Sequence, residues 1–297
     1  MADTLRQQLS QRVDSLDYMP SIPVALFPLL HYLEQPLDSL DVQQVVDMIS
    51  QDKSLAAQCL RMANSSLFGR REDIENIRSA VVALGLQRIR DIALSCSVLQ
   101  LMPGNAGVDP TIFWEHSLGC ALVCRHFARR IGFSDPSKAY LGGLLHDLGV
   151  IVNLWLFPKE FCSALSTAST QHIPLHEAEQ VQLGFTHCES GYLLAKKWNI
   201  NEGLLAVIHS HHAPNPADSN PALVALVSLA DLLCRMGSLG HGFVEERQVN
   251  VRGEAAFEVL LQRHPRLAEF DWARLTFELE SYLDEVHEIV NAIYRPQ

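Results

Sequence analysis

Ionisable side chains interrupt the longest apolar stretches of this chain. Asp147 is the only charged residue of the stretch 141–157, and Asp231 is the only one of 221–234. His116 lies in a similar apolar helical pattern. A carboxylate inside a protein core costs several kcal/mol unless it has a partner, and the candidate partners in these stretches are histidines or a metal ion. The fold must therefore bring such partners to both aspartates.

Composition and charge narrow the function classes. The chain has 297 residues, of which 48% are hydrophobic and 19% are charged, which is typical of a folded globular protein. Its formal net charge of -11 argues against general binding to nucleic acid or to an anionic membrane, because both require a basic face. We predict neither a nucleic-acid partner nor a membrane partner.

The cysteines and the N-terminus predict a cytoplasmic protein. The seven cysteines form no CxxC pair and lie mostly in apolar helical segments, so they read as reduced core residues. The first 20 residues lack the apolar core of a signal peptide, and the apolar runs elsewhere are broken before they reach membrane-spanning length.

The periodicity of apolar residues is helical throughout, which predicts an all-α fold. The segment 102–110 contains two prolines and two glycines and is the predicted domain boundary, giving an N-terminal helical subdomain (1–104) and a helical bundle (105–297). The predicted helices span residues 3–16, 24–33, 41–50, 53–63, 77–84, 87–101, 111–131, 136–155, 174–183, 187–198, 202–211, 221–236, 251–264 and 271–294.

Helical spacing combined with close packing would place several of the polar residues near one another. His116 shares the apolar stripe of its helix and should point inward. Gly142, Gly143 and Gly149 weaken a helix but allow close packing, which would bring the His146–Asp147 pair near His116 and Asp231. Histidines and a carboxylate converging from separate helices can bind Zn, Fe, Mn or Ni. The spacing leaves open the alternative of a hydrogen-bonded core without metal.

Five motifs of the second half of the chain resemble the HD superfamily of metal-dependent phosphohydrolases. In order, they are FWEHSLGCALVCRHFAR, YLGGLLHDLGVIV, FTHCESGYLLAKKWNI, LAVIHSHHAP and VSLADLL. Together with SIPVALFPLLHYLEQPLDSLDVQQVVDMISQDKSLAAQCLRMANSSLFG and IENIRSAVVALGLQRIRDIALS, they resemble the HDOD family of bacterial signalling modules over residues 18–236. The resemblance implies an N-terminal helical subdomain packed on an HD-like bundle. It also implies a regulatory or output module without demonstrated catalysis.

The same resemblance implies a ligand set for one or two divalent transition-metal ions. A first ion would be held by His116, His146, Asp147 and Asp231. A second ion would be held by His187 together with His211 or His212, with Asp147 bridging the two ions.

Two departures from the catalytic relatives argue against hydrolysis. Those relatives follow HDxG with a lysine that reaches phosphate, whereas here Gly149 is followed by Val150, and the chain lacks their GYP motif after the histidine pair. We therefore expect a non-catalytic signalling module that binds a protein partner or a small ligand. The alternative is a metal-dependent phosphohydrolase of a nucleotide, a cyclic nucleotide or a cyclic dinucleotide, which would need a phosphate-binding cation such as Lys196 or Arg235.

The remaining histidines are weaker candidates for metal ligands. His209 could replace one member of the His211–His212 pair as a ligand. His172 and His176 are predicted to be exposed helix-start residues, with the lining of a pocket as the alternative. His241, His264 and His287 are predicted to lie on the surface. Glu189 is interpreted as a first-turn glutamate favoured by the helix dipole.

Overall fold

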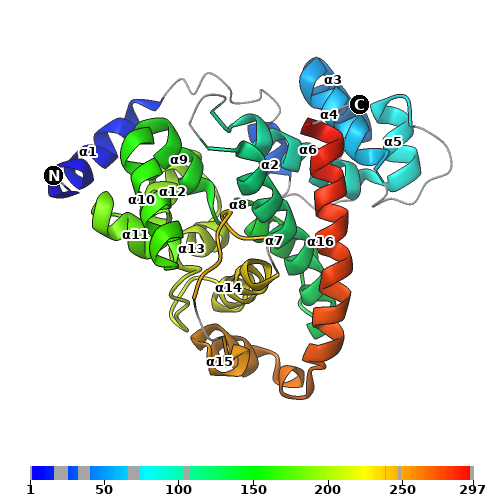
Figure 1. The fold of residues 1–297 in the computed structure, drawn as a ribbon. Coiled ribbons are helices and arrows are strands. Elements are labelled where there is room, and N and C mark those ends of the chain that lie inside the picture. The colour runs from blue at the N-terminus through cyan, green and yellow to red at the C-terminus, as the bar shows by residue number, and fades with distance from the viewer. Residues whose placement is uncertain are drawn as a thin grey trace. The chain divides into compact units, whose positions relative to one another are not determined.

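The computed structural model describes residues 2–16, 26–32, 41–65, 74–103, 108–237, 239–246 and 249–294. Every regular element within these ranges is a helix (Figure 1), which confirms the all-α prediction. The predicted boundary segment 102–110 includes residues 104–107, which lie outside the described part of the chain.

The chain divides into two compact units. One contains residues 1–17 and 103–283, and the other contains residues 18–102 and 284–297. This division differs from the predicted split at both ends of the chain. The first helix, α1 (Ala2–Asp14), packs on α12 (His187–Lys197).

Specific bonds hold α1 in the first of these units. Arg6 forms an ion pair with Glu189 at 2.7 Å, and the Lys197 ammonium donates to the backbone oxygen of Asp14 at 2.6 Å. Glu189 thus has a structural partner that the sequence interpretation did not identify.

The unit of residues 18–102 is built from short helices whose ends carry clear signals. Asp41 accepts a hydrogen bond from the Gln43 amide, and Asp52 accepts from the amides of Ser54 and Leu55, so both are N-caps as their residue types favour. Its helices are α2 (Leu26–Tyr32), α3 (Val42–Gln51), α4 (Lys53–Ala63), α5 (Ile77–Leu84) and the largely buried α6 (Leu86–Gln100).

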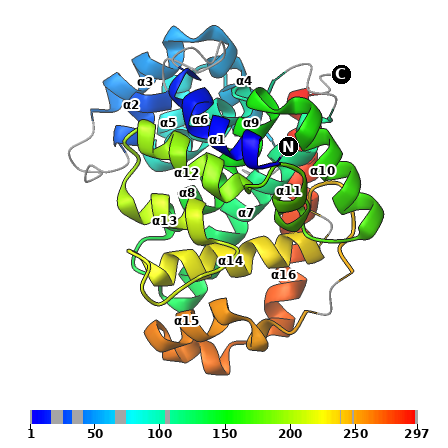
Figure 2. The same cartoon turned by 90° about the vertical axis from the view of Figure 1, so that its left-hand side faces the viewer.

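The larger unit carries the HD-like motifs. Its longest buried helix is α7 (Pro110–Ile131), which packs against α8 (Pro136–Leu145) and α14 (Pro221–Met236), as Figure 2 shows from the side. The remaining helices are α9 (Leu148–Leu156), α10 (Pro158–Gln171), α11 (Leu175–Gln182), α13 (Glu202–Ser210) and α15 (Ala255–Arg263). The last helix, α16 (Trp272–Tyr294), is divided between the two units after residue 283. The sequence analysis did not predict α10.

The predicted helix 136–155 is wrong in one respect that matters for the site. The structure breaks it at His146 and Asp147, between α8 and α9. Adjacent residues of a continuous helix point about 100° apart, because the helix has about 3.6 residues per turn. The break allows both side chains to face the same point.

The stretch Pro136–Leu156 is also the one that length and composition would allow to cross a membrane, among the described residues. Within its most apolar window, 89% is buried inside the protein. Neighbouring helices therefore cover this apolar surface, as expected for the core of a helical bundle.

The glycines of this region permit very close backbone contacts, as predicted. A Cβ atom on Gly143 would lie 2.6 Å from the backbone oxygen of Cys120 on α7. A Cβ atom on Gly149 would collide with the backbone oxygen of His187 at the start of α12. Because the obstructing atoms belong to the backbone, neither can turn away.

We expect Gly149→Ala to lower the free energy of unfolding by at least about 2 kcal/mol, since the added methyl must separate α9 from α12. Gly240→Ala is the matched control, because its Cβ would meet only ordinary contacts, the nearest at 3.6 Å. Urea unfolding of both variants measures the difference. Equal free energies of unfolding in the two variants would contradict the close approach of α9 to α12.

Candidate metal centre

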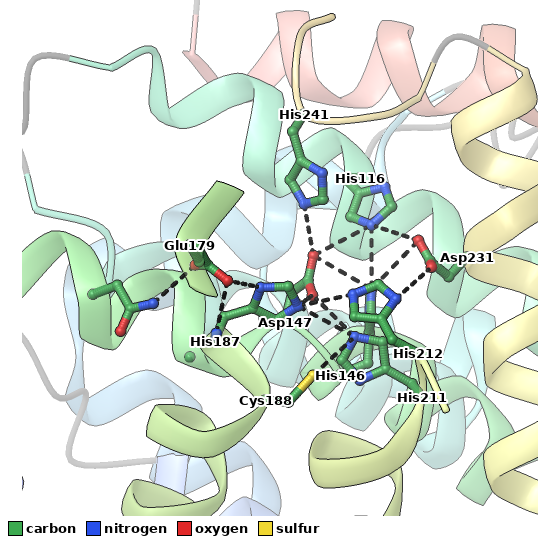
Figure 3. Close-up of polar contacts among 12 residues, drawn as sticks. His116, His146, Asp147, Glu179, His187, Cys188, His211, His212, Asp231 and His241 are labelled. Atoms are coloured by element: carbon green, nitrogen blue, oxygen red, sulfur yellow. Dashed lines mark hydrogen bonds and ion pairs between the residues drawn. The ribbon is translucent and has the colours of Figure 1, made fainter. Parts of the chain in front are cut away.

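All the residues predicted as ligands converge in one buried cluster of the larger unit (Figure 3). They come from five different helices or helix ends. His116 lies on α7, the His146–Asp147 pair at the α8–α9 break, His187 at the start of α12, the His211–His212 pair just after α13, and Asp231 on α14. The side chain of His212 is the most exposed of them, at 12%.

The carboxylate of Asp147 lies at the centre of this cluster. Its Oδ2 is 3.3 Å from His116 Nε2 and 3.4 Å from His146 Nε2. Its Oδ1 is 3.2 Å from His187 Nε2 and 3.5 Å from His211 Nε2. The two oxygens of one carboxylate therefore face two separate sets of imidazoles.

The first set is completed by Asp231. Its Oδ1 lies 3.3 Å from His116 Nε2, and the Nε2 atoms of His116 and His146 are 3.2 Å apart. The second set contains both members of the histidine pair: His187 Nε2 is 3.4 Å from His211 Nε2 and 3.0 Å from His212 Nε2. Cys188 lies beside this second set, with its sulfur 3.9 Å from His211.

Four of these histidines have their Nδ1 atom held by an oxygen acceptor. A neutral imidazole carries one N–H, so an acceptor at Nδ1 leaves a lone pair on Nε2. In each case the Nδ1–H group donates to an oxygen: His116 to Leu239 O at 2.5 Å, His146 to Gly143 O at 2.7 Å, His187 to Glu179 Oε2 at 2.6 Å, and His211 to Val207 O at 3.1 Å.

In the neutral form of these imidazoles, the Nε2 lone pairs consequently point at one another and at carboxylate oxygens. Such a convergence of acceptors is repulsive unless a cation lies among them. Ligand atoms about 2.0–2.1 Å from a tetrahedral or octahedral ion are roughly 2.8–3.4 Å apart, which is close to most of the separations found here. The donor set and its spacing fit a transition-metal ion.

The two carboxylates require positive charge beside them, and without a metal ion it comes from Arg235 and from protons on some of the imidazoles. Burial alone would lower the pKa of His116, but the carboxylates of Asp147 and Asp231 overcome it and hold that pKa well above its usual value. Burial opposes ionisation of both aspartates, yet the neighbouring cationic groups hold their pKa values well below the usual range. By contrast, burial lowers the pKa of His146 to about 3, so this imidazole is neutral.

Glu179 is a functional residue that the sequence analysis missed. Its side chain is fully buried, and Oε2 accepts hydrogen bonds from both the backbone N–H and the Nδ1–H of His187, at 2.8 and 2.6 Å. Its Oε1 accepts from the Asn153 amide at 2.9 Å. Nothing in the polar segment HEAEQVQ distinguished this glutamate from its exposed neighbours.

The prediction that His241 lies on the surface is wrong. Its side chain is 3% exposed, and its Nε2 lies 2.9 Å from Asp147 Oδ2. His176, also predicted to be exposed, stacks on the ring of His212 with centroids 4.1 Å apart. Neither residue shares a helical stripe with the predicted ligands, so the sequence pattern carried no signal for them.

Of the two cations considered as phosphate binders, only Arg235 lies at the site. It forms a bidentate pair with Asp231 at 3.0 and 2.9 Å, and its remaining terminal nitrogen binds Glu245 at 2.6 Å. Lys196 instead lies 5.9 Å from the ring centre of Tyr192.

A cavity of about 560 Å³ adjoins the second set of histidines. His211, His212 and Arg235 line it, together with other residues of α11, α14 and α15 and the segment 172–174 that precedes α11. Three carboxylates also line it, those of Glu177, Glu246 and Glu254. The cavity has the size of a small-molecule site, and its walls carry three carboxylates, one guanidinium and four imidazoles.

We expect Glu179→Ala to reduce the free energy of unfolding by about 3 kcal/mol, because it leaves the donors of His187 and Asn153 buried without an acceptor. The control Glu177→Ala, an exposed residue of the same helix, should change it by less than about 0.5 kcal/mol. Thermal and urea unfolding measure both. Similar small losses in the two variants would contradict the role given to Glu179.

Comparison with known proteins agrees with this fold. The model of the HDOD domain family matches residues 19–214. A crystal structure of an HDOD domain protein of unknown function from Geobacter sulfurreducens is 29% identical, covers 97% of this chain and 98% of its own, and has a TM-score of 0.80. A candidate signal-transduction protein from Marinobacter aquaeolei shares the fold, with a TM-score of 0.75, 19% identity, and coverage of 99% of this chain and 66% of its own.

A curated relative from Treponema pallidum, described only as an uncharacterized protein, is 25% identical over 224 residues. These residues make up 75% of this chain and 43% of that relative, so the chain spans less than half of its length. The family match covers most of the chain and includes the motif histidines up to His212. The chain belongs to the HDOD domain family.

Proposed function

We propose that this protein is a bacterial signal-transduction module whose HD-type site holds one or two transition-metal ions and which does not hydrolyse phosphoesters. The observation that carries the metal assignment is the shared orientation of four histidines. Each has its Nδ1–H bonded to a fixed oxygen, so that its Nε2 lone pair faces the carboxylate of Asp147 or its partners. Such outer bonds orient the ligands in metalloproteins.

The surroundings of the site support a regulatory rather than a catalytic role. A phosphoester substrate would need a free cation near the ions, and the guanidinium of Arg235 already binds Asp231 and Glu245. The three glutamates in the cavity wall would repel a phosphate. Val150 also stands where the catalytic relatives have a lysine.

A bound ion would join helix ends that are distant in sequence. His116 on α7, His187 on α12 and Asp231 on α14 would become ligands of one bimetallic centre through Asp147. Metal binding would thereby stabilise one packing of the bundle, and its gain or loss would change the surface offered to a protein partner. We expect this metal-dependent binding of a partner to take place in the cytoplasm.

The second candidate function is a metal-dependent phosphohydrolase of a nucleotide or cyclic dinucleotide. The complete set of HD-type ligands and the cavity of about 560 Å³ beside them favour it. When bound, the ions would polarise a phosphate and lower the pKa of water. His212, which faces this cavity, would be the residue placed to move a proton.

Elemental analysis of protein purified without chelator or immobilised metal tests the metal assignment. We expect about one or two equivalents of transition metal in the wild type, and a loss of most of it in Asp147→Asn, which keeps the side-chain shape. His209→Ala, at an exposed position outside the cluster, should keep the wild-type content. Circular dichroism of each variant checks its folding. A metal-free wild type, or equal content in all three proteins, would contradict the proposal.

A hydrolysis assay separates the two functions. We expect the metal-loaded protein to release no product from bis(p-nitrophenyl) phosphate or from a cyclic dinucleotide above the rate of the Asp147→Asn variant. Turnover that requires Asp147 would instead establish the phosphohydrolase.

A further inference from the structure

The segment 239–246, here called the strap, follows α14 and lies against the metal centre. Its first residue, Leu239, offers the backbone oxygen that holds Nδ1–H of His116 at 2.5 Å. Near its other end, Glu245 accepts from Arg235, which in turn binds Asp231. The strap thus reaches two of the ligands expected for the first ion, one directly and one through an arginine.

Between these two contacts, His241 contacts a third expected ligand of the first ion, Asp147. Figure 3 shows its ring directed at Asp147, with Nε2 2.9 Å from Oδ2. The ring lies against those of His116 and Phe113, with centroids 4.7 and 5.8 Å away. Its Nδ1 is buried and has no hydrogen-bond partner among the described residues.

This pattern is the reverse of that in the four histidines whose Nδ1 is held by an acceptor. A proton on Nδ1 of His241 would be buried without an acceptor and would set the Nε2 lone pair against a carboxylate oxygen. A proton on Nε2 forms a hydrogen bond to the ionised Asp147 instead. A nitrogen that carries a proton cannot bind a metal through that atom.

We propose that His241 is a positioning residue that donates its Nε2–H to Asp147 Oδ2 and is not itself a metal ligand. The bond fixes the plane of the bridging carboxylate. Oδ2 then stays toward His116 and His146, while Oδ1 stays toward His187 and His211. The strap thereby supplies outer bonds to the first metal position, a role that the HD motifs do not contain.

The protonation pattern can be measured without any metal. In metal-free protein with ¹⁵N-labelled histidine, long-range ¹H–¹⁵N NMR should show His241 as the Nε2–H tautomer. His146, which is neutral and bonded through Nδ1 to Gly143, should show the Nδ1–H tautomer and serves as the internal reference. A proton on Nδ1 of His241 would overturn the inference.

The effect on metal binding rests on the proposed function and is tested with Co²⁺ as the probe. His241→Leu removes the donor, and we expect Co²⁺ affinity at one position to fall about 10- to 100-fold. His241→Gln can place an amide N–H near the same point, so its affinity and its Co²⁺ absorption spectrum should stay close to those of the wild type. His209→Leu, which is exposed, is the control for loss of a histidine.

The other outcomes are distinguishable. If Gln lowers the affinity as much as Leu, and X-ray absorption shows one imidazole fewer around the ion, His241 is a ligand and the positioning role is wrong. Unchanged affinity in the Leu variant would also overturn it. If the wild type binds no Co²⁺ at all, the proposed metal function fails, whereas the tautomer measurement still decides whether His241 donates to Asp147.

Discussion

The structure of the larger unit depends on the burial of two ionised carboxylates, Asp147 and Asp231. Both lie in apolar helical surroundings and are almost completely inaccessible to solvent. Leaving one of them unpaired would cost several kcal/mol, which is a large part of the stability of a typical domain. Arg235 and an array of imidazoles surround them, and these side chains determine which helices can pack together.

Backbone geometry makes this arrangement possible. The break between α8 and α9 turns His146 and Asp147 toward one point, and Gly143 and Gly149 let the broken helix approach α7 and α12 to backbone contact. Larger residues at the two glycines would hold the helices apart and separate Asp147 from His187. The geometry of the site and the packing of the core therefore depend on the same close backbone contacts.

Much of the site was predictable because its ligands are polar residues in apolar sequence. Asp147 and Asp231 stand out from their surroundings, and the order of the HD-like motifs grouped them with the histidines. Glu179 and His241 could not be found in this way, since one lies in a polar segment and the other follows α14 in irregular chain. Their roles come from contacts in the folded structure: Glu179 binds His187, which is 8 residues away in sequence, and His241 binds Asp147, which is 94 residues away.

The limits of the fold prediction have similar causes. Residues 136–155 have continuous helical periodicity, so only packing reveals the break at His146. The assignment of α1 to the larger unit depends on Arg6, Lys197 and other contacts with distant residues. Helices with clear caps, such as those after Asp41 and Asp52, were predicted closely because their signals are local.

The central claim is that a cation belongs among the Nε2 atoms around Asp147. Anomalous diffraction from crystals of protein purified without added metal, recorded on both sides of the absorption edges of Fe, Mn, Zn and Ni, tests it directly. The account predicts an anomalous peak about 2.0–2.2 Å from an oxygen of Asp147 and from the facing Nε2 atoms. Imidazoles bonded directly to the carboxylates, with no anomalous peak among them, would contradict it.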